Sequence, residues 1–126
     1  MKKIKILWVE DNPDFADSIC LRIKGNLRNN NIELEQIEKQ TNGTHVYNTV
    51  RDWEPNLILM DHNLDDSKFN GANLIIEIRF LNAEIPIIYY SSEMNERLTN
   101  LVSGEKNIIC CVRDSVGDEI LGLLSL

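Results

Sequence analysis

The sequence predicts an α/β protein with a five-stranded, doubly wound parallel sheet in a single domain. Short apolar runs, of the kind that form strands buried on both faces, alternate along the 126 residues with segments in which apolar residues recur every three or four positions. The second pattern is that of amphipathic helices. Strands that alternate with helices are typical of a parallel sheet covered by helices on both sides, and the length suits one hydrophobic core.

The first predicted strand is the apolar run at residues 4–9, and two acids, Glu10 and Asp11, follow it directly. Asn12-Pro13-Asp14 then has the composition of a helix start, with a capping Asn, a Pro at the first helical position and an acid in the first turn. Apolar side chains recur every four residues from Phe15 to Leu27, so one face of this helix packs on the sheet.

The second predicted strand, at residues 32–37, alternates apolar and polar side chains, which indicates an exposed, edge-like strand. The alternation slips by one position near Gln36. A turn at 41–43 leads to a short helix at 46–53, which ends before Pro55 because the residue that precedes a proline disfavours helical backbone.

The third predicted strand, Leu57 to Met60, runs straight into Asp61, and a polar loop follows as far as Gly71. We place Asp61 at the mouth of the strand rather than inside it, because an ionised carboxylate is costly to bury. Open α/β sheets bind ligands just beyond the carboxyl ends of their strands, so Asp61 is a candidate site residue; the alternative is an Asp that merely starts a loop. The apolar spacing at 74–81 predicts the third helix.

Two further strand–helix pairs complete the pattern: strands at 86–93 and 108–112, followed by helices at 98–102 and 116–124. The fourth strand carries the hydroxyl of Ser91 where the first and third carry carboxylates, and the fifth ends in Arg113. The sequence therefore predicts polar residues at the carboxyl ends of four strands.

The net charge of −7 argues against nonspecific binding to nucleic acid or to anionic membranes, which requires a basic patch. No apolar run approaches the length of a membrane span, and the chain starts with a strand rather than a signal-peptide core. Cys20, Cys110 and Cys111 are odd in number, stand in apolar contexts and lack metal-ligand spacing with either histidine. We therefore expect buried, reduced thiols in a cytoplasmic protein.

Because the carboxyl ends of parallel strands meet at one edge of the sheet, we expect one site to contain Glu10, Asp11, Asp61, Asn63, Ser91 and Arg113. Three converging carboxylates repel one another and raise at least one pKa, and Mg²⁺ with its preference for oxygen ligands relieves this. An anion beside the metal would find a hydroxyl and a guanidinium as partners. The pattern predicts a metal and phosphate site with a carboxylate nucleophile, and no Gly-rich loop indicates a nucleotide.

The acidic pair Glu10-Asp11, then Met60-Asp61, Ser91 and a cation end the first, third, fourth and fifth predicted strands in that order. This arrangement resembles the receiver domain of two-component response regulators, and the resemblance covers the whole chain. It implies a flavodoxin-like receiver domain over residues 1–126 with no output domain, working as a stand-alone response regulator.

By this resemblance Asp61 is the phosphoacceptor, which takes a phosphoryl group from a histidine kinase or a phosphotransfer protein. The resemblance also implies the Mg²⁺ shell: the carboxylates of Asp11 and Asp61, the backbone carbonyl of Asn63, and Glu10 acting mainly through water. Ser91 would hydrogen-bond a phosphoryl oxygen and move inward on phosphorylation. Beyond self-phosphorylation from a phosphodonor and slow autodephosphorylation, no enzyme activity is expected. The signal would reach an unidentified downstream protein through residues 93–126, without direct contact to nucleic acid or membrane, and the oligomeric state stays open.

Three features depart from the family's pattern. Arg113 and Asp114 stand where the family usually has Lys followed by Pro, and a planar guanidinium is not equivalent to a compact ammonium. Cys110 replaces the aromatic residue that family members commonly carry three positions before the lysine. The loop from Asp61 to Gly71 is longer than the common form and lacks its usual Pro. These departures concern the switching mechanism rather than the acceptor.

Two alternatives belong to other functional classes. One is a phosphorylation-independent interaction module with a vestigial acidic site, which Arg113 and Cys110 favour and the complete acidic set disfavours. The other is a metal-dependent phosphatase with an aspartyl intermediate. Such enzymes often carry a second carboxylate two residues after the nucleophile as general acid, where this chain has the amide Asn63, and so small a domain has no evident cap over a substrate pocket.

Overall fold

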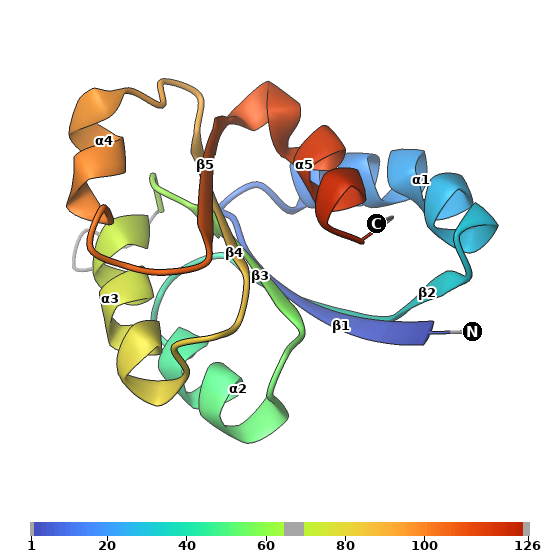
Figure 1. Cartoon of the computed structure of the whole chain (residues 1–126), viewed down its shortest axis with the longest axis horizontal. Helices are drawn as coiled ribbons and strands as arrows, with labels where there is room; N and C mark the ends of the chain where they lie inside the picture. Colours follow the sequence, from blue (N-terminus) through green and yellow to red (C-terminus); the bar gives the residue numbers. More distant parts are fainter. Residues whose placement is uncertain (1, 65–69, 125–126) are drawn as a thin grey trace.

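Five parallel strands form one sheet in the order β2-β1-β3-β4-β5, with helices on both faces (Figure 1). The computed structural model describes residues 2–64 and 70–124, the side chains of residues 35 and 36 excepted. The strands are β1 (Lys2–Val9), β2 (Ile32–Gln40), β3 (Leu57–Asp61), β4 (Ile87–Ser91) and β5 (Ile108–Val112). The helices are α1 (Pro13–Asn29), α2 (Val46–Trp53), α3 (Gly71–Leu81), α4 (Glu96–Leu101) and α5 (Val116–Leu124), the last preceded by a 3₁₀ turn (Arg113–Ser115). The predicted fold class is confirmed.

The strand order places a topological switch point between β1 and β3. From β1 the chain crosses to β2 on one side, and then to β3 and the remaining strands on the other. Helices α1 and α5 cover one face of the sheet, and α2, α3 and α4 cover the opposite face (Figure 1). The crevice outside the carboxyl ends of strands at such a point is the usual ligand site of open α/β sheets.

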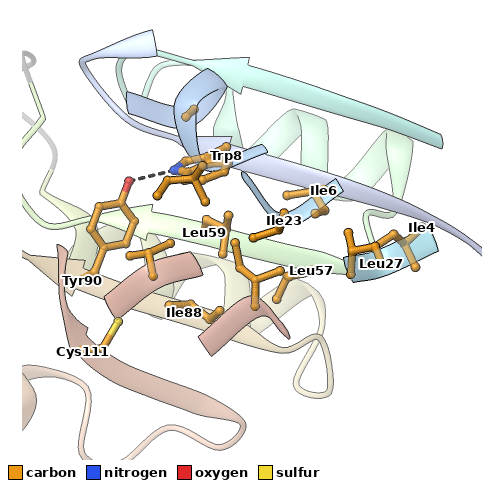
Figure 2. Close-up of a cluster of buried hydrophobic side chains, with 14 of the residues drawn as sticks. Ile4, Ile6, Trp8, Ile23, Leu27, Leu57, Leu59, Ile88, Tyr90 and Cys111 are labelled. Carbon is orange, nitrogen blue, oxygen red and sulfur yellow. Dashed lines mark hydrogen bonds between the residues drawn. The ribbon is translucent and has the colours of Figure 1, made fainter. Parts of the chain in front are cut away.

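Two apolar clusters fill the spaces between the sheet and its helices. Trp8 and Tyr90 belong to the cluster under α1 and α5, together with Leu59 and Ile23 (Figure 2). Tyr89, the neighbour of Tyr90 in β4, belongs to the cluster under α2, α3 and α4. Successive side chains of a strand point to opposite faces, so each buried strand supplies both clusters.

Helix α1 begins as the sequence predicts. The Asn12 side-chain oxygen accepts a hydrogen bond from the Asp14 backbone N–H, and Pro13 occupies the first turn. Helix α3 begins at Gly71, three residues before its predicted start at 74, because Asn70 caps it by accepting from the backbone N–H of Asn73. The apolar spacing identified the buried face of this helix but not its cap.

Strand β2 is an edge strand, as its alternating pattern predicts. Ile4 of β1 lies opposite Leu34, whereas Lys5 lies opposite Gln36, so the register shifts by one residue at this point. The slip in the apolar alternation near Gln36 therefore marks a real irregularity of the pairing.

Two other expectations need correction, and a third lies outside the described residues. Strand β4 ends at Ser91 rather than at residue 93, because the chain turns there and the Glu93 N–H donates to the Ser91 hydroxyl oxygen. All three cysteines are free, but only Cys111 is buried; Cys20 on α1 and Cys110 on the edge strand β5 are half-buried, and the neighbours Cys110 and Cys111 point to opposite faces of the sheet. The predicted loop after the third strand falls largely at residues 65–69, outside the described residues.

Within the described part of the chain, no helix is long and apolar enough to cross a membrane.

Candidate functional site

The predicted site residues come together at the carboxyl edge of the sheet. Glu10 and Asp11 directly follow β1, Asp61 and Ser91 are the last residues of β3 and β4, and Arg113 directly follows β5. The sheet order makes the ends of β1 and β3 neighbours at the switch point, with β4 next to β3. Parallel pairing thus brings together side chains from four separate stretches of the sequence.

The three carboxylates form a compact acidic group. One oxygen from each of Glu10, Asp11 and Asp61 lies within 4.8 Å of the others. Glu10 and Asp61 are only 3% and 2% exposed, whereas Asp11 is half-buried. Hard oxygen ligands at this spacing are the donor set that Mg²⁺ uses, with water completing its shell.

Asp61 is more deeply buried than its predicted place at the mouth of the strand. Its Oδ1 accepts a hydrogen bond of 3.1 Å from the Asn63 backbone N–H, and its Oδ2 lies 3.5 Å from Nη1 of Arg113. These donors replace the water that an exposed carboxylate would have. Burial still raises the pKa of Asp61 to about 6, although the Asn63 N–H and the Arg113 charge both act to lower it. The buried carboxyl group of Asp61 therefore ionises at a higher pH than an exposed aspartate does, as is common at functional sites.

Asp11 titrates abnormally for a different reason. A hydrogen bond with the Glu10 carboxyl is the main cause of its raised pKa, and burial and the negative charge of Glu10 add to the rise. The expectation that converging carboxylates raise at least one pKa is therefore met. The carboxylate oxygens of Asp11 and Asp61 lie close enough together to bind one divalent cation, which would favour the ionised form of both residues.

Glu10 is fixed by groups of the protein itself. Its Oε2 accepts from the Asn12 backbone N–H at 2.9 Å, and its Oε1 accepts from the Tyr90 hydroxyl at 2.9 Å. Nη2 of Arg113 lies 2.9 Å from the same Oε1. Glu10 was expected to act on a metal through water, but both of its oxygens already have protein donors, so in this structure it serves first as a partner of Arg113.

Arg113, directly after β5, forms ion pairs with two of the acids. Its guanidinium bridges Glu10 and Asp61, and its Cζ lies 4.0 Å from the ring centroid of Phe15 in α1. A planar guanidinium can bind carboxylates and stack on an aromatic ring at the same time, which a lysine ammonium does less well. The position that departs from the family's pattern therefore still contributes a cation to the site.

Ser91 and Asn63 form the polar side of the site next to Asp61. The Asn63 side-chain amide donates to the Ser91 hydroxyl oxygen at 3.3 Å, and the backbone N–H of Glu93 donates to it at the same distance. Asn63 is exposed and Ser91 is 1% exposed. The Ser91 hydroxyl is therefore bound by the amide of Asn63, a side chain that solvent can reach and that stands two residues after Asp61.

Sequence reasoning missed the tyrosines of β4. Tyr90 contacts Glu10 from the face of α1, and Tyr89 contacts the ring of His62 from the opposite face, with its hydroxyl 2.5 Å from Nδ1. Burial, and then the charge of Arg97, lowers the pKa of His62, so the neutral ring is favoured beside the Tyr89 hydroxyl. The sequence does contain a signal for these contacts: two tyrosines stand in a strand predicted to be buried, and a buried Tyr hydroxyl usually has a hydrogen-bond partner.

Solved structures of receiver domains share this architecture. The N-terminal domain of a response regulator/sensory box/GGDEF 3-domain protein from Carboxydothermus hydrogenoformans is 21% identical, with a TM-score of 0.70 and coverage of 94% of this chain and 89% of that one. The N-terminal signal receiver domain of a two-component system response regulator from Bacteroides fragilis is 15% identical, with a TM-score of 0.73 and coverage of 98% and 94%. Chemotaxis protein CheY4 from Vibrio cholerae is 16% identical, with a TM-score of 0.71 and coverage of 97% and 96%. The chain has the receiver-domain fold.

Neither a protein-family model nor a curated protein matches the sequence. At such low identities the likeness concerns the receiver fold alone, so the roles of individual residues rest on the geometry of the site. That geometry gives this receiver fold an acidic group with Asp61 at its base, a hydroxyl from Ser91 on one side and the guanidinium of Arg113 on the other.

Proposed function

We propose that this chain is a receiver that accepts a phosphoryl group on Asp61 in the presence of Mg²⁺. The donor would be a histidine kinase or a phosphotransfer protein in the cytoplasm, and the phosphorylated state would act through contacts with a downstream protein. One observation carries the proposal. Asp61 ends β3 at the switch point of a receiver fold, with two other carboxylates within 4.8 Å and a guanidinium 3.5 Å away.

The reaction would be a phosphoryl transfer between two residues. A carboxylate oxygen of Asp61 forms a bond to phosphorus, the bond from phosphorus to the donor histidine breaks, and the product is an aspartyl phosphate. The residues that would hold Mg²⁺ are Asp11 and Asp61, and the ion would offset the negative charge shared by the carboxylates and the incoming phosphoryl group. Burial raises the pKa of Asp61 and a hydrogen bond with Glu10 raises that of Asp11, and a divalent cation beside both carboxylates would favour their ionised forms.

Two further residues would bind the transferred group. Arg113 already lies 3.5 Å from Oδ2 of Asp61, and a guanidinium forms strong, charge-assisted hydrogen bonds with phosphoryl oxygens. Ser91 ends the neighbouring strand, and its hydroxyl is tied to Asn63, the second residue after Asp61. If both side chains turned toward Asp61, the new phosphate would have Arg113 as a partner on one side and Ser91 on the other.

A second candidate function is an interaction module that is not phosphorylated. The pairing of Arg113 with both Glu10 and Asp61 favours it, because this guanidinium partly neutralises the acidic group without any metal. In that case the site would stabilise the fold, and the partner would recognise one fixed conformation.

Intact-mass spectrometry separates the two functions. We expect incubation with acetyl phosphate and Mg²⁺ to add one phosphoryl group to the wild-type protein and none to Asp61→Asn. Equal adducts on both proteins would contradict the assignment of Asp61. If the wild-type protein forms no adduct with acetyl phosphate or with a histidine-phosphorylated donor protein, and does not bind Mg²⁺, the second function is the correct one.

A further inference from the structure

A continuous hydrogen-bond chain leads from the core of the protein to the acidic site. The indole Nε1 of Trp8 lies 2.8 Å from the Tyr90 hydroxyl oxygen (Figure 2), and the same hydroxyl lies 2.9 Å from Oε1 of Glu10. Trp8 and Tyr90 are fully buried, and Glu10 is 3% exposed. Trp8 belongs to β1 and Tyr90 to β4, with β3 between these strands in the sheet. The series of hydrogen bonds therefore links two strands that are not neighbours.

The chemistry of the side chains fixes the direction of this chain. An indole N–H can only donate, so the Tyr90 oxygen must accept from Trp8. The single phenolic hydrogen is then directed at Glu10, whose carboxylate can only accept when it is ionised. Because it accepts a hydrogen bond from Trp8, the Tyr90 hydroxyl donates its own hydrogen to Glu10.

Glu10 in turn determines where Arg113 lies. Oε1 receives both the Tyr90 hydroxyl and Nη2 of Arg113, while Oε2 receives the Asn12 N–H, so the carboxylate has little freedom to rotate. Phe15 completes the arrangement, because its ring lies under the guanidinium and packs against the ring of Tyr90, with centroids 6.0 Å apart. Away from bulk water, hydrogen bonds of this kind are less screened and specify a single geometry.

We propose that Tyr90 is a positioning residue, whose hydroxyl, oriented by Trp8, locks Glu10 so that Glu10 holds Arg113 beside Asp61. Any effect of Tyr90 on phosphoryl transfer rests on the function proposed above, whereas the positioning of Arg113 by Tyr90 and Glu10 does not. In this arrangement the cation is kept within reach of the phosphoryl group before it arrives. These hydrogen bonds thus fix the side chain of an arginine that starts a 3₁₀ turn rather than lying within a strand.

The neighbouring tyrosine provides a matched control. Tyr89 is also fully buried in β4 and also uses its hydroxyl, but it points to the opposite face and contacts His62 instead of Glu10. Tyr90→Phe and Tyr89→Phe each remove one hydroxyl from the same strand without changing the net charge. A difference between the two variants therefore reports the contact with Glu10.

The first measurement is the exchange of side-chain N–H hydrogens with water, followed by NMR on the full chain without metal or phosphodonor. The Arg113 side-chain signal is assigned by its loss in Arg113→Lys. We expect Tyr90→Phe to speed its exchange about tenfold, the effect of losing one hydrogen bond to a charged group, and Tyr89→Phe to leave it unchanged. If Tyr90→Phe does not fold, Trp8→Phe tests the same chain one bond further back and should speed the exchange in the same direction by a smaller factor.

The second measurement is the phosphorylation rate with acetyl phosphate and Mg²⁺. Tyr90→Phe should slow the wild-type reaction about tenfold but have no effect in an Arg113→Ala background, because the residue that it positions is then absent. A merely structural role would give the same loss in both backgrounds and would overturn the proposal. Unchanged Arg113 exchange in a folded Tyr90→Phe protein would overturn it as well. No adduct on the wild-type protein would contradict the proposed function instead, and the exchange measurement would still decide whether Tyr90 holds Arg113.

Discussion

At the scale of single residues, the buried carboxylate of Asp61 makes stability depend on pH. Its pKa is about 6 in the folded protein and near 3.8 in the unfolded chain, so between these values the folded state binds more protons. Stability from this group is therefore greatest at low pH and is lost as the pH rises through about 6. Without metal, Asp61→Asn should be more stable than the wild type by roughly 1–2 kcal/mol at about pH 7.5, and the difference should largely vanish at about pH 3, below the unfolded pKa. Urea unfolding at both pH values measures this, and a constant difference would contradict it.

Asp11 is expected to carry much of the affinity for Mg²⁺. A unit charge about 4 Å from another contributes several kcal/mol at an effective dielectric constant of about 20, and more when the partner is divalent. Asp11→Ala should therefore weaken Mg²⁺ binding at least about tenfold in a calorimetric titration. Asp14→Ala removes the same charge from an exposed position near the start of α1 and should change the affinity little. Equal losses in both variants would remove Asp11 from the metal shell.

At the scale of elements, the first turn of α3 is pressed against the end of β3. A Cβ atom on Gly71 would lie 2.4 Å from the backbone carbonyl oxygen of Asp61, and neither backbone can yield easily. Gly25 in α1 is different, because its Cβ would meet no atom within 4 Å. Gly71→Ala should therefore destabilise the protein by roughly 1–3 kcal/mol, whereas Gly25→Ala should stabilise it by about 0.5–1 kcal/mol. Urea unfolding of the two variants tests this contrast, which a similar effect of both would rule out.

At the scale of the whole molecule, metal binding should stabilise the fold. An ion that binds only the folded state adds RT ln(1 + [L]/Kd), about 2.7 kcal/mol when its concentration is a hundred times Kd. We expect Mg²⁺ to raise the thermal unfolding midpoint of the wild type and to have much less effect on Asp11→Ala. Because the net charge of −7 makes any salt mildly stabilising, the reference solution is KCl of the same ionic strength. The same midpoint in both salts would show that the acidic group holds no ion.

The sequence by itself determined the order of strands and helices, the edge position of β2 and the set of residues at the carboxyl ends of the strands. These features follow from local patterns: apolar periodicity, a capping Asn12 before Pro13, and acids placed directly after apolar runs. Even the irregular pairing of β2 left a trace in the sequence near Gln36. The convergence of the site follows from parallel pairing, which is a general rule and needs no coordinates.

Only the tertiary structure decided how those residues are partnered. Tyr90 and Glu10 are 80 residues apart in the sequence, and no local pattern indicates that a phenol of β4 donates to the acid after β1. The depth of Asp61 also depends on contacts with distant groups, because Arg113 reaches it from beyond β5. Side-chain partners across a sheet depend on strand order, register and rotamers together, whereas strand and helix patterns depend on neighbours along the chain. For that reason the fold and the members of the site were predictable from the sequence, and the hold of Tyr90 and Glu10 on Arg113 was not.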